Sequence, residues 1–112
     1  MKRAAVAIAT LAAATFAAAS VPVAADDTGA ATMHDLHKEG SYTCMVDHIH
    51  AGTGEGKDKP AAVAAAIKEW YAYTAGEYGS DWAIWGKSAA QKFSYTKAAA
   101  GWSATVESRP CK

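Results

Sequence analysis

Apolar residues recur at the spacing of a β-strand near the middle of the chain. Residues 41–50 (SYTCMVDHIH) alternate between two faces and are rich in residues that favour strands. One face would carry Tyr42, Cys44, Val46, His48 and His50. The next nine residues, 51–59, read AGTGEGKDK, and this concentration of glycine and charge predicts a loop.

The apolar spacing then changes to three or four residues, which indicates a helix. Pro60 suits the first turn of that helix, Asp58 could cap it, and Gly79 suits its end. The inward stripe would consist of Val63, Ile67, Trp70, Tyr71, Thr74 and Tyr78. A second, shorter helix is expected over residues 80–90, unless the first helix continues past Gly79.

Two alternating segments at the end of the chain predict a β-hairpin. Residues 91–97 and 102–109 would be its strands, with Phe93, Tyr95, Trp102, Ala104 and Val106 on the inner face. The element order is then β-α-α-β-β. This order predicts an α+β fold, a small three-stranded antiparallel sheet covered on one face by one long and one short helix. In such a fold the aromatic residues form the core rather than a platform for a sugar or cofactor.

The aromatic residues of the second half follow a characteristic order. Together with several small residues, this order runs Trp70, Tyr78-Gly79, Trp82, Trp85, Ala89, Trp102 and Pro110-Cys111. Over residues 63–112 this order resembles that of small exported bacterial proteins of uncharacterised function. The resemblance implies export and a shared packing pattern, and it brings no catalytic residues to transfer.

The first 25 residues have the three parts of a secretion signal peptide. A positive start at Lys2 and Arg3 precedes an apolar run over residues 4–19. Small residues at 23–25 suit a signal peptidase, so we predict cleavage after Ala25. A retained membrane anchor is the alternative, but the alanine-rich run is short for a span of about 20 residues.

Cleavage would leave a flexible arm over residues 26–40 and a single α+β domain over residues 41–112. The whole chain has 11 basic and 11 acidic residues, so losing Lys2 and Arg3 leaves 9 against 11, a net charge of −2. This charge argues against nucleic acid as a partner, because phosphate binding needs a clustered basic face. The remaining chain has no apolar run long enough to span a membrane. We therefore expect a periplasmic or secreted protein, whose oligomeric state the sequence does not indicate.

Cys44 and Cys111 are the two cysteines of the chain, and both follow the signal. In an exported protein such a pair favours a disulfide, here one between residues 67 positions apart. Two free thiols, an intermolecular bond and a cysteine-containing metal site are the alternatives.

All four histidines fall within 17 consecutive residues. On the predicted strand, His48 and His50 would project from one face with Cα atoms about 6.6 Å apart. His34 and His37 would share one face of a helical turn before it. Imidazoles at these spacings suit zinc, copper or nickel. The alternative is that the four histidines are ordinary solvated surface residues.

No segment carries a catalytic signature. Ala51 and Asp58 occupy the places where a phosphate-binding loop needs glycine and Ser/Thr. Cys44 and His48 would lie about 13 Å apart along a strand, too far for a Cys–His pair. The sequence therefore predicts a non-enzymatic binding protein without a required cofactor, whose partner is another protein or a small ligand. Binding of zinc, copper or nickel through the His-x-His pair is the alternative function, and a structural protein with no discrete ligand is a third.

Overall fold

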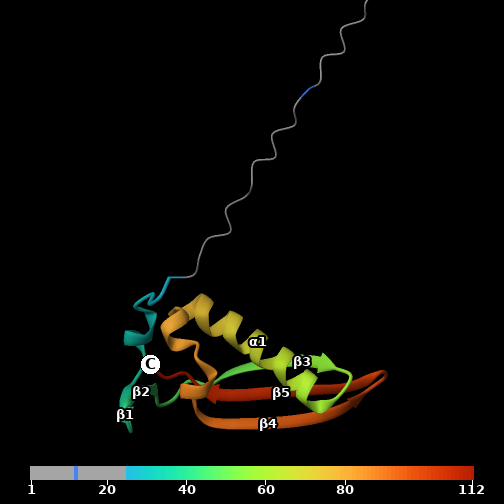
Figure 1. The fold of residues 1–112 in the computed structure, drawn as a ribbon. Coiled ribbons are helices and arrows are strands. Elements are labelled where there is room, and N and C mark those ends of the chain that lie inside the picture. The colour runs from blue at the N-terminus through green and yellow to red at the C-terminus, as the bar shows by residue number, and fades with distance from the viewer. Residues whose placement is uncertain (1–11, 13–24) are drawn as a thin grey trace, which may run out of the picture.

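One long helix lies across a three-stranded antiparallel sheet, and a separate two-stranded hairpin stands at one end of that sheet (Figure 1). The structure, a computed structural model, describes residue 12 and residues 25–112. Apart from residues 12 and 25, the predicted signal peptide lies outside the described residues.

The described elements are one α-helix, five strands and three short 3₁₀ turns. The hairpin pairs β1 with β2, and the larger sheet has the order β3-β5-β4. The elements are β1 (Leu36–Glu39), β2 (Tyr42–Met45), β3 (His50–Gly56), α1 (Lys59–Tyr78), β4 (Ala89–Ala98) and β5 (Gly101–Arg109), with 3₁₀ turns at Ala30–Met33, Ser80–Trp82 and Trp85–Lys87.

Helix α1 begins and ends at the predicted residues. The Asp58 carboxylate accepts a 2.8 Å hydrogen bond from the Ala61 N–H, and Pro60 lies in the first turn. At the other end, Gly79 has φ 105° and donates its N–H to the Ala75 carbonyl at 2.9 Å. Because few residues other than glycine adopt that backbone conformation, Gly79 ends the helix.

The composition of residues 51–59 predicted a loop, and this prediction was wrong. Most of the segment belongs to strand β3. Its glycines stand at every second position, so Gly52, Gly54 and Gly56 share the face that packs on α1. A Cβ atom on Gly54 would lie 2.6 Å from the Ala65 Cβ, and one on Gly56 would lie 2.5 Å from the Ala62 nitrogen. Glycine therefore allows the strand backbone to lie directly against the helix backbone.

The helix and the strand keep a common register along this contact. Four helix residues advance about 6.0 Å and two strand residues about 6.6 Å, so the two repeats nearly match. Gly56 faces Ala62, Gly54 faces the Ala65–Ala66 pair, and Gly52 faces Trp70. The buried helix stripe is accordingly made of Ala62, Ala66, Trp70, Thr74, Ala75 and Tyr78. The predicted stripe was wrong at Tyr71, which is 46% exposed, because its neighbour Trp70 is the residue that faces β3.

The predicted arrangement of one sheet and two helices is wrong in two places. Residues 41–50 are not one strand: β2 ends at Met45, and the chain turns before His50 begins β3 in the other sheet. Residues 80–90 contain two short 3₁₀ turns and the start of β4 instead of a second helix. The described part of the chain is thus an α+β arrangement of one helix and two sheets, not β-α-α-β-β.

The C-terminal hairpin has the predicted pairing, but its outer strand is open to solvent. Phe93 lies opposite Val106 and Tyr95 opposite Ala104, on the same face of the sheet. Helix α1 packs on β3 and β5, so Phe93 and Tyr95 remain 44% and 41% exposed. An edge-to-face contact between Phe93 and Trp85 joins this strand to the buried aromatic residues.

A disulfide joins Cys44 of β2 to Cys111, so the smaller hairpin is tied to the end of the chain. Backbone hydrogen bonds between Thr43 and Lys112, of 2.8 and 2.9 Å, flank this bridge. Among the described residues no helix has the length and apolarity that crossing a membrane requires.

Replacing Gly54 with alanine should destabilise the fold, because the new methyl group meets the backbone of α1. We expect a loss of about 2–3 kcal/mol, at the upper end of overpacking effects. Gly76 provides the matched control, since a Cβ there meets nothing within 4 Å. Gly76→Ala should raise stability by about 0.5–1 kcal/mol. Urea unfolding of the two variants measures both changes, and equal effects would contradict the packing described here.

The disulfide should contribute about 2–4 kcal/mol, since it closes a long loop. Urea unfolding with and without reductant measures this contribution, and the double variant Cys44→Ser/Cys111→Ser should match the reduced protein. The intact mass under non-reducing conditions should be two hydrogens below that of the dithiol. A dithiol mass in native material would contradict the bridge.

Candidate functional site

Three of the four histidines meet at the C-terminal end of α1. The His48 and His50 rings have centroids 4.8 Å apart, and the His34 and His48 rings have centroids 4.5 Å apart. The last turn of α1 contributes Glu77 and Tyr78 to the same place. Residues far apart in the sequence thus converge on one cluster, which we call the histidine site: His34, His48, His50 and Glu77.

His50 occupies the site because it continues the register between β3 and α1. Thr74 follows Trp70 by one helical turn, as His50 precedes Gly52 by two strand residues. The His50 Nδ1 accordingly lies 2.9 Å from the Thr74 hydroxyl oxygen. Its other nitrogen, Nε2, lies 2.9 Å from the His48 Nε2 and 3.1 Å from a Glu77 carboxylate oxygen.

The chain before β1 brings His34 to the site by binding the end of α1. Thr28 donates its N–H to the Tyr78 carbonyl at 3.0 Å and its hydroxyl to the Glu77 carbonyl at 2.7 Å. These bonds satisfy carbonyl groups that a helix end leaves free. His34 follows the 3₁₀ turn of this segment, and its Nε2 lies 2.9 Å from the Tyr78 hydroxyl.

Burial sets the protonation of two groups in the cluster. His50 is only 8% exposed, and this burial lowers its pKa, although the Glu77 carboxylate partly opposes the shift. Burial also raises the pKa of Tyr78, and a hydrogen bond with Glu77 adds to that shift. The cluster therefore contains a neutral imidazole and a neutral phenol at pH 7.

Hydrogen bonds from the helix orient two of the imidazoles. The Tyr78 hydroxyl and the His34 Nε2 lie 2.9 Å apart, so a hydrogen bond between them holds the His34 ring in place. The His50 Nε2 lies 3.1 Å from a Glu77 carboxylate oxygen, which can only accept, so this nitrogen donates its proton and the Thr74 hydroxyl donates to the His50 Nδ1. Such second-layer hydrogen bonds fix the tautomer of metal-binding histidines.

Two overlapping groups of donor atoms meet in the cluster. Ligand atoms of His34, His48 and Glu77 all lie within 4.8 Å of one another. His50 is not a member of this group, but its Nε2 lies beside both His48 and Glu77. In a tetrahedral site with bonds of about 2.0–2.1 Å, neighbouring donors are about 3.3 Å apart. The observed 2.9 and 3.1 Å separations need to widen by only a few tenths of an ångström.

A cavity of about 360 Å³ opens beside the histidine site. His48, His50 and Glu77 line it together with Ile49, Ala51 and Tyr73. Ile49 and Tyr73 are 56% and 60% exposed. Three donor residues thus share this open stretch of surface with Ile49, Ala51 and Tyr73.

His37, the remaining predicted ligand, lies apart from the others. It belongs to β1, where its Nε2 is 3.7 Å from an Asp35 carboxylate oxygen and its side chain is 62% exposed. The neighbouring Glu39 forms a two-pronged ion pair with Arg109, with both N···O distances 2.6 Å. The expectation that His34 and His37 share a helical face is wrong, because the 3₁₀ turn ends at Met33.

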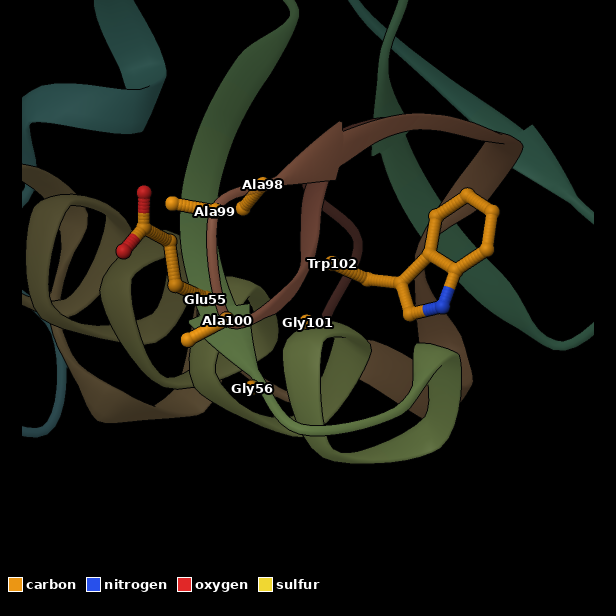
Figure 2. Close-up of a pocket in the computed structure, with 7 residues that line it drawn as sticks. All are labelled: Glu55, Gly56, Ala98, Ala99, Ala100, Gly101 and Trp102. Atoms are coloured by element: carbon orange, nitrogen blue, oxygen red, sulfur yellow. The ribbon is translucent and has the colours of Figure 1, made fainter.

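Two other parts of the described surface lack the features of a functional site. The cavity at the tip of the β4–β5 hairpin, of about 400 Å³, is lined by Glu55, Gly56, Ala98, Ala99, Ala100, Gly101 and Trp102. Figure 2 shows Glu55 and Trp102 pointing to opposite sides of the chain, so polar groups do not converge there. Glu39 lies near Cys44 and Cys111, but the disulfide leaves these sulfurs no thiolate for a metal.

The sequence reasoning missed the residues that α1 contributes to the site. Thr74, Glu77 and Tyr78 follow an i, i+3, i+4 pattern, which places them on one helix face. Thr74 is fully buried within an otherwise apolar stripe. That single polar residue was the available signal, because a buried hydroxyl requires a polar partner.

Comparisons with protein-family models, with curated proteins and with solved structures found no match to this chain.

The ion pair beside His37 should make stability depend on pH. Arg109 lowers the pKa of Glu39, so the pair stabilises the fold above the carboxyl's ordinary pKa, and this contribution disappears as the pH falls through the lowered value. Glu39→Gln should lower the free energy of unfolding by about 0.5–1 kcal/mol at pH 7, a small effect because solvent screens the pair. Near pH 2 the substitution should leave the free energy of unfolding unchanged. Thermal unfolding across this range measures the difference. Glu55→Gln is the control on the open sheet face, and a loss that persists at pH 2 would contradict the ion-pair explanation.

Proposed function

We propose that this protein binds one divalent transition metal ion, Zn²⁺, Cu²⁺ or Ni²⁺, through His34, His48, His50 and Glu77. The observation that carries the proposal is the meeting of the His48 Nε2, the His50 Nε2 and a Glu77 oxygen at 2.9 and 3.1 Å. Imidazole nitrogen and carboxylate oxygen are the donors that these ions accept in proteins.

The surroundings of the cluster support a metal over a set of ordinary surface histidines. His50 is only 8% exposed and lies 2.9 Å from the Thr74 hydroxyl, and the Tyr78 hydroxyl lies 2.9 Å from the His34 Nε2, so contacts with α1 hold both rings in place. The contacts of 2.9 Å between His50 and His48 and of 3.1 Å between His50 and Glu77 bring three donor residues together, and a metal ion could take the place of the protons in these contacts. Protein-partner binding and the absence of enzymatic activity stay predictions from the sequence.

We also propose that the protein acts in the periplasm or outside the cell. The predicted signal at residues 1–25 supports export, and the Cys44–Cys111 disulfide is compatible with an oxidising compartment. In such a compartment an imidazole-rich site suits capture or buffering of a transition metal.

Isothermal titration of the purified protein with Zn²⁺, Cu²⁺ and Ni²⁺ at about pH 7.5 tests the metal proposal. We expect one ion per chain with a Kd below about 1 μM for at least one metal. The double variant His48→Ala/His50→Ala should weaken binding by more than about a hundredfold. Loss of a second-layer hydrogen-bond partner typically lowers metal affinity about 10–100-fold, and this variant removes two direct ligands.

His37→Ala is the matched control, because His37 lies in the same part of the sequence but outside the cluster. It should leave affinity and stoichiometry unchanged. His48→Asn, at a half-buried position, provides a milder ligand variant if the double variant unfolds. Binding that is weaker than about 100 μM, or that depends on His37 as much as on His48, would overturn the proposal.

A further inference from the structure

We infer that strand β4 is the interface of a symmetric dimer. The β4 strands of two copies of this chain pair antiparallel about a two-fold axis at Tyr95, and the two three-stranded sheets become one continuous sheet. The partner is thus a second copy of the chain. This inference goes beyond the proposed function and does not depend on metal binding.

One side of the β4 backbone has no neighbouring strand among the described residues, because β4 is the outer strand of its sheet (Figure 1). Ala98 and Gly101 flank the two-residue turn and pair with each other, so their N–H and C=O groups are bonded together. Bonded and free residues then alternate along the strand. The backbone groups of Phe93, Tyr95 and Lys97 accordingly face away from β5, toward solvent.

The opposite edge of the sheet, formed by β3, is partly occupied by the chain itself. The Thr53 N–H donates to a Glu69 carboxylate oxygen at 3.3 Å. A side chain of α1 thus uses a backbone group that a further strand would need. Of the two edges, β4 therefore presents fewer obstacles to a second strand.

The lysines of β4 are directed at their own sheet. Exposed lysines commonly keep edge strands from pairing with other chains. Here the Lys97 ammonium lies 4.6 Å from the centre of the Trp102 ring, and Lys92 is paired with Glu107 of β5. Contacts within the copy thus engage the charges that would otherwise protect this edge.

The regular part of β4 determines the register of the pairing. A bulge interrupts the strand between Ala89 and Lys92, and the turn follows Ala98. The regular stretch 92–98 is therefore centred on Tyr95. An axis at that residue pairs Tyr95 with its own counterpart and Phe93 with Lys97 of the second copy. All the free backbone groups of these three residues then have partners.

The side chains that meet in this register are compatible. Phe93 and Tyr95, which are 44% and 41% exposed, lie on the face of the sheet that carries α1. Their counterparts in the second copy continue this aromatic surface across the axis. On the other face Ser94 lies opposite Thr96 of the second copy, and pairs of hydroxyl side chains stabilise neighbouring strands.

The charges of the two strands do not oppose each other directly. In this register Lys92 lies opposite Ala98 and Lys97 lies opposite Phe93. The whole chain has 11 basic and 11 acidic residues, so two copies do not repel each other through their net charge. The strand is therefore complementary to itself, which favours a second copy over an unrelated strand.

Sedimentation velocity of the purified, metal-free protein tests the dimer. Between about 10 μM and 1 mM we expect a monomer–dimer equilibrium with a Kd of about 10–100 μM, since an edge contact is a small interface. Tyr95→Lys places two like charges opposite each other at the axis and should raise the Kd at least about tenfold. Tyr71→Lys is the matched control, because Tyr71 is 46% exposed on α1, away from β4. It should leave the Kd unchanged.

Cysteine cross-linking tests the register with substitutions at exposed positions that preserve the fold. In a mixture of Ser94→Cys and Thr96→Cys proteins, the new thiols face each other with Cα atoms about 4.5 Å apart, within reach of a disulfide. In either variant alone the new cysteines are diagonal neighbours about 7–8 Å apart, which is too far. The mixture should therefore cross-link several-fold faster, and intact mass identifies the mixed dimer.

The outcomes are separate from those of the metal titration. A protein that stays monomeric at about 1 mM would overturn the inference, because the predicted dimer would dominate at that concentration. A dimer that Tyr95→Lys leaves unchanged, or that Tyr71→Lys weakens equally, would also overturn it. Equal cross-linking by the mixture and by either variant alone would contradict the axis at Tyr95. None of these results changes the expected binding of one metal ion per chain.

Discussion

The direct contact between the backbones of β3 and α1 is the constraint on which the rest of the structure depends. Gly52, Gly54 and Gly56 leave no side chain between strand and helix, and any added Cβ would overlap the helix. The strand cannot slide far along the helix, because each glycine of β3 must stay opposite its own residues of α1. The contact fixes which helix residues are buried, and it leaves the face of β4 beyond the reach of α1.

The same register positions the histidine site. Beyond Gly52 and Trp70, the next pair along the contact is His50 and Thr74, which are joined by a hydrogen bond. Glu77 and Tyr78 occupy the following turn of the helix, beside His48. The site therefore lies at the end of the glycine stripe, where His50 follows the pattern of the glycines and Thr74 faces it from the helix.

The sequence predicted those elements whose residues have strong local conformational preferences, and it failed where contacts between distant residues decide the structure. The helix was predictable because Asp58, Pro60 and Gly79 have strong local preferences at helix ends. Strand β3 was not, because glycine disfavours strands unless another backbone lies close, and that neighbour comes from α1. The grouping of His48 with His50 was foreseen from their spacing, but their convergence comes from a turn between two sheets. Glu77 could be assigned to the site only once the register between strand and helix was known.

The position of the disulfide determines how the protein would respond to mechanical load. A force that pulls on the two ends of the chain would pass through the covalent bridge between Cys44 and Cys111 and bypass everything between them. The force would act on the segment that precedes Cys44, and the hydrogen bonds between Thr28 and the end of α1 would have to break as that segment is pulled away. Of the histidine site, His34 alone lies in the loaded segment, while His48, His50 and Glu77 are within the shielded loop. Tension on the chain would thus remove one donor from the site and leave the other three in place.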